Sequence, residues 1–116
     1  MIKIWHNPRC SKSRDSKNLL DELDCQYEVF EYLKHSLTAK DIKEIMLMLG
    51  ISDVRLMLRT KEKEYKELDI ADESKTQDEI IDLVVANPKL IERPIVTKDG
   101  HAAIGRPIEK VKELLG

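Results

Sequence analysis

The sequence has few cysteines, no long apolar run and no excess of charge of one sign. Its two thiols, Cys10 and Cys25, are too few for the disulfide framework of a small secreted domain. The longest apolar run, residues 45–49, is far shorter than the roughly 18 residues of a membrane helix, and no signal sequence is visible. The 20 Lys and Arg are balanced by 22 Asp and Glu, unlike the basic excess of general nucleic-acid binders. We therefore expect a cytoplasmic protein that binds neither membranes nor nucleic acid.

The composition is that of one folded domain. Hydrophobic residues make up 41% of the 116 residues, which is enough to bury a core, and charged residues make up 36%. A chain of this length is too short for two cores of ordinary size. We expect a single domain over residues 1–116, with a helical insertion over about 38–87.

Hydrophobic patterning at both ends predicts an α/β fold. Residues 2–5 alternate like a strand, a helix follows from Ser11, and residues 27–33 suit a second strand. A helical crossover between them implies that these two N-terminal strands are parallel. Near the C-terminus, 94–97 and 102–104 form a predicted hairpin around Asp99-Gly100, and Pro107 is expected at the first position of a last helix.

Between these ends, capping signals predict a helical block. Thr38 with Asp41 resembles a capping box, as does Thr76 with Glu79, and each precedes an apolar stripe of helical spacing. Ser52 is expected to cap a short helix that runs to Leu58. The charged residues 61–67 fit either a loop or a short helix.

Cys10 has the surroundings of a nucleophile. It lies where a turn meets the start of a helix, and the unpaired N–H groups there stabilise anions, both a thiolate and a bound oxyanion. His6, Arg9 and Arg14 are close in sequence, and any cation aimed at the sulfur lowers its pKa. Cys25 has no such neighbours, so we expect it to fill space in the core.

Cys10 has no second cysteine in its first helical turn. Residues 10–13 read Cys-Ser-Lys-Ser, so the oxidised sulfur has to be resolved by a thiol of another molecule. Ser13 could equally be an ordinary first-turn residue that satisfies backbone N–H groups.

Residues 6–14, His-Asn-Pro-Arg-Cys-Ser-Lys-Ser-Arg, resemble the H-N-P-x-C-x-x-S-R signature of the arsenate reductase family that works with glutathione and glutaredoxin. Three downstream segments resemble the arginine blocks of that family, in order and at similar separations: Leu58-Arg59, Glu92-Arg93-Pro94-Ile95-Val96 and Gly105-Arg106-Pro107. Tyr65-Lys66-Glu67-Leu68 fits the family's spacer. The resemblance extends from about residue 2 to about residue 115.

The resemblance implies a thioredoxin-like mixed sheet with a helical insertion, and a role for each matching residue. Cys10 is implied to be the thiolate that attacks arsenate, with His6 setting its reactivity. The oxyanion is implied to lie among Arg59, Arg93 and Arg106, the loop to be shaped by Asn7, Ser13 and Arg14, and Pro94 to be a cis proline. Glutathione is implied as co-substrate without a bound cofactor, glutaredoxin as partner, and the protein is expected to be a monomer.

The charge and hydrogen-bonding geometry of three arginines suit the binding of an oxyanion next to a thiolate. A thiolate that approaches an oxyanion is repelled unless cations offset the combined charge, and a guanidinium donates two parallel hydrogen bonds to adjacent oxygens. Arg9 and Arg55 are expected to be surface charges. His35 and His101 are expected to be solvated and to form no metal site, because they lack partner ligands.

Two alternatives remain open. One is a thiol oxidoreductase of the same fold that acts on another substrate. The other is a redox regulator resembling the Spx proteins that bind RNA polymerase, although those generally use a C-x-x-C switch, and Ser13 removes its second thiol.

Overall fold

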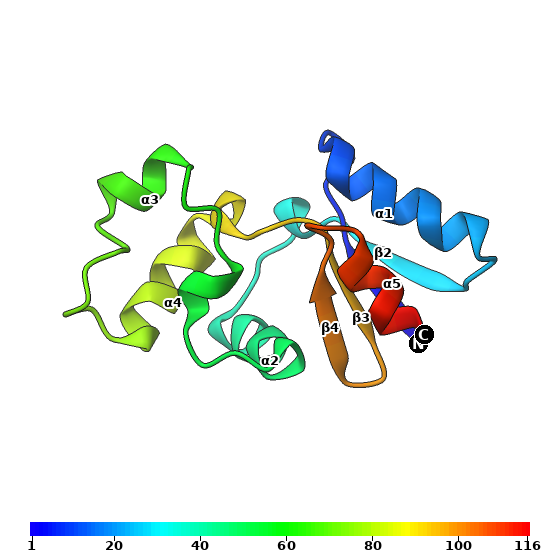
Figure 1. The fold of residues 1–116 in the computed structure, drawn as a ribbon. Helices are drawn as coiled ribbons and strands as arrows, with labels where there is room; N and C mark the ends of the chain where they lie inside the picture. The colour runs from blue at the N-terminus through cyan, green and yellow to red at the C-terminus, as the bar shows by residue number, and fades with distance from the viewer. The chain divides into compact units, whose positions relative to one another are not determined.

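The computed structural model describes all residues, 1–116, and its contacts divide the chain into two compact units. The sheet unit comprises Met1–His35 and Arg93–Gly116, and the helical unit comprises Ser36–Glu92 (Figure 1). The single domain over residues 1–116, with its insertion over about 38–87, stays a prediction. No helix is both long and apolar enough to cross a bilayer.

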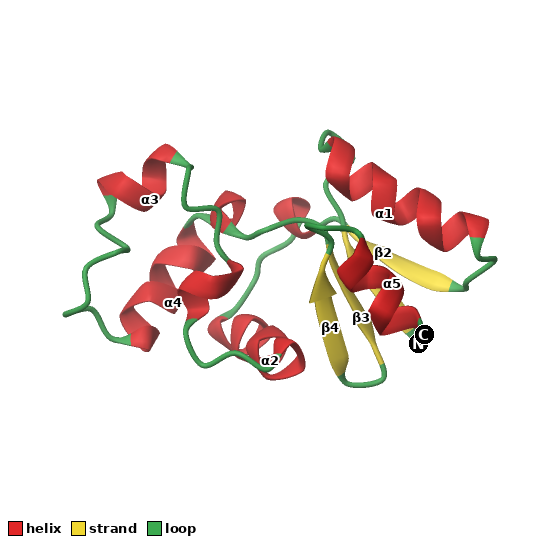
Figure 2. Ribbon diagram, viewed as in Figure 1, coloured by secondary structure: helices red, strands yellow, loops and turns green.

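The sheet unit contains four strands and two α-helices (Figure 2). Its elements are, in chain order, β1 (Ile2–Trp5), α1 (Ser11–Glu22), β2 (Tyr27–Phe30), β3 (Ile95–Lys98), β4 (His101–Ile104) and α5 (Glu109–Leu115). The strand order is β2-β1-β3-β4, in which β1 and β2 are parallel and the other two pairs are antiparallel. The predicted fold class is confirmed: a thioredoxin-like mixed sheet with two parallel N-terminal strands, a C-terminal hairpin and a helical insertion.

The core of the sheet unit lies where α1 and α5 pack on one sheet face. Ile4 of β1 stands opposite Val96 of β3, and both are completely buried. Leu19 and Leu20 of α1 and Val111 of α5 join them in one apolar cluster. Cys25 packs against the same cluster.

The helical unit contains α2 (Ala39–Leu49), α3 (Lys63–Glu67) and α4 (Gln77–Ala86), with 3-10 turns at Val54–Met57 and Pro88–Leu90. Both predicted capping boxes are present, because Thr38 and Thr76 each accept a hydrogen bond from the backbone N–H three residues on. The charged segment 61–67, for which the sequence allows a loop or a short helix, contains the short helix α3.

Three predicted element ends are wrong. Asp53 caps the 3-10 turn instead of Ser52, because its carboxylate accepts the N–H of Arg55. The second strand ends at Phe30, since the chain then enters a 3-10 turn at Tyr32–Lys34 in which the Tyr32 ring stacks on Trp5. The last helix begins at Glu109, because the preceding turn is tight and the carbonyl of Pro107 accepts the N–H of Lys110.

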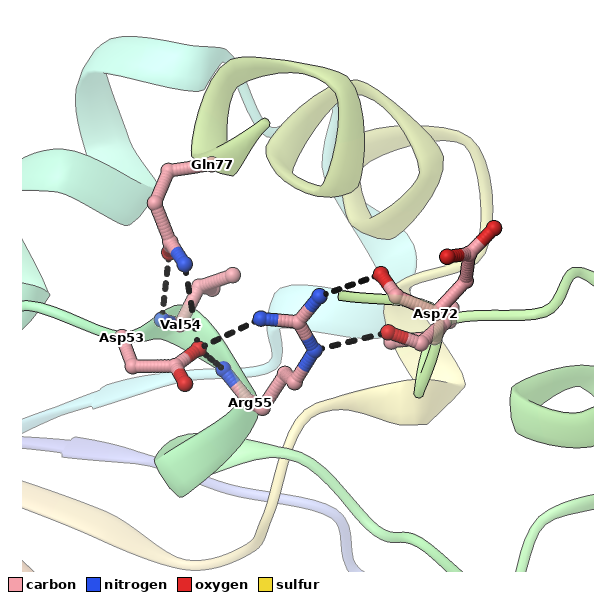
Figure 3. A network of polar contacts seen from close by, with 6 residues as sticks. Asp53, Val54, Arg55, Asp72 and Gln77 are labelled. Atoms are coloured by element: carbon pink, nitrogen blue, oxygen red, sulfur yellow. Dashed lines mark hydrogen bonds and ion pairs between the residues drawn. The ribbon is translucent and has the colours of Figure 1, made fainter. Parts of the chain in front are cut away.

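The prediction that Arg55 is a surface charge is also wrong. Its side chain is only 18% exposed and is held on both sides within the helical unit (Figure 3). Nε donates to the carbonyl of Ile70, Nη2 to the carbonyl of Asp72, and Nη1 contacts the Asp53 carboxylate. Asp53 also accepts a hydrogen bond from Gln77, so Arg55 and Asp53 together tie three segments of this unit.

Candidate active site

Cys10 is the N-cap residue of α1. Its backbone is extended, its carbonyl accepts the N–H of Arg14 at 3.0 Å, and its own N–H donates to the carbonyl of Asn7 at 3.0 Å. The first-turn N–H groups of α1, which no helical carbonyl can satisfy, lie next to this residue. The structure thus places the half-buried thiol at the helix start that the sequence indicated.

The pKa of the Cys10 thiol lies below its ordinary value. Burial raises this pKa, but hydrogen bonds from the backbone N–H of Ser13, from the Arg93 guanidinium and from the N–H of Lys12 lower it. The positive charge of Arg106 lowers it further. A lowered pKa increases the thiolate fraction near neutral pH, and the thiolate is the nucleophilic form.

Two arginines from the second part of the sheet unit reach the sulfur. Arg106 Nη2 lies 3.2 Å from Cys10 Sγ, while Arg106 Nε donates to the carbonyl of Arg93 at 2.8 Å. The pKa of Arg93 is raised: burial lowers it, but interactions with Cys10 and with the buried Tyr32 hydroxyl outweigh burial. Because a guanidinium stays charged at neutral pH, both side chains bring a positive charge to the thiol.

Gly105 is a residue whose importance the sequence did not reveal. Its N–H donates to the carbonyl of Pro94 at 2.9 Å, and an added Cβ would lie 2.6 Å from Ser16 Oγ and 2.7 Å from Pro94 Cγ. Only glycine fits this close approach between α1 and the segment that carries Arg106. The one available signal was a glycine directly between a predicted strand and an Arg-Pro pair. The peptide bonds Arg93–Pro94 and Arg106–Pro107 are both cis.

The loop before Cys10 is braced by His6, Asn7 and Ser13. His6 Nδ1 and Ser13 Oγ share a hydrogen bond of 2.6 Å, and the Asn7 N–H donates to the same hydroxyl at 3.0 Å. Asn7 Oδ1 accepts the N–H of Arg9. The pKa of His6 is lowered, first by burial and then by the charge of Lys17, so the imidazole is neutral near pH 7. His6 bonds to Ser13 and does not supply a cation to the sulfur.

The other residues singled out in the sequence make contacts with groups other than the Cys10 sulfur. Arg14 donates to the carbonyl of Pro8 at 2.9 Å and so closes the loop. Arg59 belongs to the helical unit, where its N–H donates to the carbonyl of Leu90 and its guanidinium pairs with Glu62. His35 stacks on Phe30, with 5.0 Å between ring centroids. No three His, Cys, Asp or Glu side chains come together in a way that could hold a metal ion.

A mixed sheet that carries a helix-start thiol with a lowered pKa, flanked by arginines, defines the class of thiol-based oxidoreductases. The chain belongs to the ArsC family, whose sequence model matches residues 5–114. The predicted membership of the arsenate reductase family is thereby confirmed.

Relatives extend over nearly the whole chain. An arsenate reductase of Neisseria meningitidis is 41% identical over 98% of this chain and 97% of its own length. An uncharacterized Escherichia coli protein, YfgD, is 47% identical over 99% of this chain and 97% of its own length. The solved structure of an arsenate reductase from Vibrio cholerae superimposes with a TM-score of 0.94 at 42% identity, covering 97% of this chain and 96% of that one.

Proposed function

We propose that this protein reduces arsenate to arsenite, with Cys10 as nucleophile, glutathione as co-substrate and glutaredoxin as the partner that recycles the thiol. The observation that carries the proposal is the contact of 3.2 Å between Arg106 and the Cys10 sulfur at the start of α1. The named arsenate reductases among its relatives support the choice of arsenate.

In the first step the Cys10 thiolate attacks the arsenic of arsenate. An S–As bond forms, and the hydroxyl group of arsenate accepts a proton from solvent and leaves as water as its As–O bond breaks, so the arsenic stays pentavalent. Arg93 and Arg106 are already charged beside the sulfur, and they offset the repulsion between the two anions as the bond forms. The N–H groups at the start of α1 offer further donors to the oxyanion.

In the second step a glutathione thiolate attacks the sulfur of Cys10. The S–As bond breaks with its electron pair on arsenic, which leaves as trivalent arsenite, and Cys10 and glutathione are joined by a disulfide. Glutaredoxin then takes over the glutathionyl group and frees Cys10, and a second glutathione reduces glutaredoxin. Two glutathiones thus supply the two electrons that arsenate gains.

The resolving thiol comes from outside because neither near neighbour can serve. Ser13 has a hydroxyl where a C-x-x-C pair has its second thiol. Cys25 follows the far end of α1, a 12-residue helix that is about 18 Å long. A disulfide requires Cα atoms within about 7 Å of each other. The use of glutathione and glutaredoxin is also why we place the protein in the reducing cytoplasm.

Arg59 is a third oxyanion ligand in this proposal, because Leu58-Arg59 resembles one of the three arginine blocks of the family. Pro94 and Arg14 are retained as residues that shape the site. Arg14 has a structural basis for this role in its bond to the carbonyl of Pro8.

An arsenate-to-arsenite assay with glutathione and glutaredoxin tests the proposal. Wild-type protein is compared with Cys10→Ser and with the matched control Cys25→Ser. We expect turnover to be lost in Cys10→Ser and retained in Cys25→Ser. Wild-type turnover no faster than that of Cys10→Ser overturns the assignment. If such an inactive protein still reduces a glutathione mixed disulfide through Cys10, the alternative of another thiol substrate is correct.

A further inference from the structure

A cleft of about 380 Å³ opens in the sheet unit between the start of α1 and the segment 105–109. One wall is the first turn of α1, with Lys12 and Asp15, and the other is the segment 105–109, with Arg106 and Glu109. Its volume lies in the range of roughly 300–1,000 Å³ that is typical of small-molecule sites. The arsenate chemistry described above uses only Arg106 of this cleft.

Cys10 does not itself line the cleft, but one residue of each wall contacts its sulfur. Arg106 contacts Cys10 Sγ at 3.2 Å, and the backbone N–H of Lys12 also bonds to that sulfur. Gly105 holds the walls together, because its missing side chain allows this segment to approach Ser16 of α1 closely. A compound bound in the cleft therefore contacts residues that themselves touch the Cys10 sulfur.

The charges lining the cleft are mixed in sign. Lys12 and Asp15 are three residues apart on α1 and so lie on one side of that helix, and both are exposed. Arg106 and Glu109 repeat the pairing of a cation and a carboxylate on the opposite wall. An inorganic oxyanion gains nothing from Asp15 or Glu109. A zwitterion with two carboxylates and one ammonium finds a partner for each of its charges.

We propose that this cleft is the binding site for glutathione, with Lys12 and Arg106 holding its carboxylates and Asp15 and Glu109 receiving its ammonium group. The proposal rests on the proposed function, and it adds where the co-substrate binds. Pro107 and Ile108 form the apolar part of the wall, against which the methylene groups of the tripeptide pack.

A larger cavity of about 610 Å³ on β4 and α5 provides the matched control. It also includes Arg106, together with Lys110 and Glu113, but it contains none of the α1 residues whose N–H groups bond to Cys10. Lys12 and Lys110 are both exposed lysines in cavities that share Arg106. Lys12→Ala removes one positive charge from the cleft, and Lys110→Ala removes one positive charge from the larger cavity.

S-methylglutathione, which binds without reacting, is titrated into wild type, Lys12→Ala and Lys110→Ala and followed by amide NMR shifts. We expect saturable shifts at residues 11–16 and 105–109. Lys12→Ala is expected to raise the dissociation constant about 1.5- to fivefold, the range for loss of one exposed ion pair, and Lys110→Ala to leave it unchanged. The absence of saturable shifts in wild type, or an equal or larger effect of Lys110→Ala, overturns the assignment.

Steady-state assays separate this inference from the proposed function. We expect Lys12→Ala to raise KM for glutathione and to leave KM for arsenate unchanged. If wild type reduces arsenate with glutathione and Lys12→Ala has an unchanged KM for glutathione, only the cleft assignment fails. If wild type does not reduce arsenate, the proposed function fails even where S-methylglutathione binds in the cleft.

Discussion

The Arg106 guanidinium lies 3.2 Å from the sulfur of Cys10, although 96 positions separate the two residues in the sequence. The helix start supplies N–H groups to the thiol locally, and Arg106 and Arg93 add charge that arrives only through folding. The reactivity of Cys10 therefore depends on the packing of the C-terminal segment against α1.

Replacement of Arg106 by glutamine is expected to raise the pKa of Cys10, because the thiolate loses an adjacent positive charge. The measurement is the pH dependence of thiolate absorbance. It is made in a Cys25→Ser background, so that Cys10 is the only thiol that contributes to the signal. Arg9→Gln is the control, since Arg9 is exposed and only its backbone N–H is bonded nearby. An equal shift in Arg9→Gln, or none in Arg106→Gln, contradicts the role given to Arg106.

Gly105→Ala is expected to lower the free energy of unfolding by about 1–3 kcal/mol, the usual cost of overpacking a tight site. Its Cβ would meet Ser16 Oγ at 2.6 Å and Pro94 Cγ at 2.7 Å. Ser16→Ala removes a buried hydroxyl without a hydrogen-bond partner, so the double variant is expected to recover part of the loss. Urea denaturation of the three variants checks this. If the two substitutions change the free energy of unfolding additively in the double variant, the side chains at positions 105 and 16 do not contact each other.

The stability of the protein is expected to depend on His6 in mildly acidic solution. Because burial lowers the pKa of His6 in the folded state, the unfolded chain binds a proton at higher pH than the folded protein. The contribution of His6 is thus complete above its ordinary pKa of 6.5 and is lost as the pH falls through 6.5 towards the folded value.

His6→Gln tests this dependence by removing the titrating group. The free energy of unfolding, measured at several pH values between about 7 and 5, is expected to fall less steeply in His6→Gln than in wild type. His101→Gln is the control, because His101 is exposed on β4. Parallel curves for wild type and His6→Gln would show that His6 is protonated equally in both states.

Arg55→Ala is expected to destabilise the protein by about 1.5–3 kcal/mol, as for hydrogen bonds to a charged group. The change leaves the carbonyls of Ile70 and Asp72 and the carboxylate of Asp53 without their arginine donor. Arg9→Ala is the control, and as a surface change it should alter stability by less than about 0.5 kcal/mol. Thermal or urea unfolding that does not distinguish the two variants would refute the structural role of Arg55.

Local signals were strong enough to predict most of the fold. The capping boxes at Thr38 and Thr76 involve residues three apart, and the Asp99-Gly100 turn requires positive φ angles that both residues adopt. Two of the errors occurred where tertiary contacts decided the outcome. Tyr32 leaves the strand pattern to stack on Trp5, and Arg55 is held half-buried because carbonyls 15 and 17 residues away accept its hydrogen bonds.

The sequence alone determined three features: the order of helices and strands, the family, and the position of a reactive cysteine at a helix start. Each of them depends on neighbouring residues or on an ungapped motif. The tertiary structure decided that Arg93 and Arg106 reach the sulfur, that His6 bonds to Ser13, and that Gly105 leaves no space for a side chain. These facts depend on contacts between distant segments, and a guanidinium that is remote in the sequence influences a thiol only when folding brings the two together.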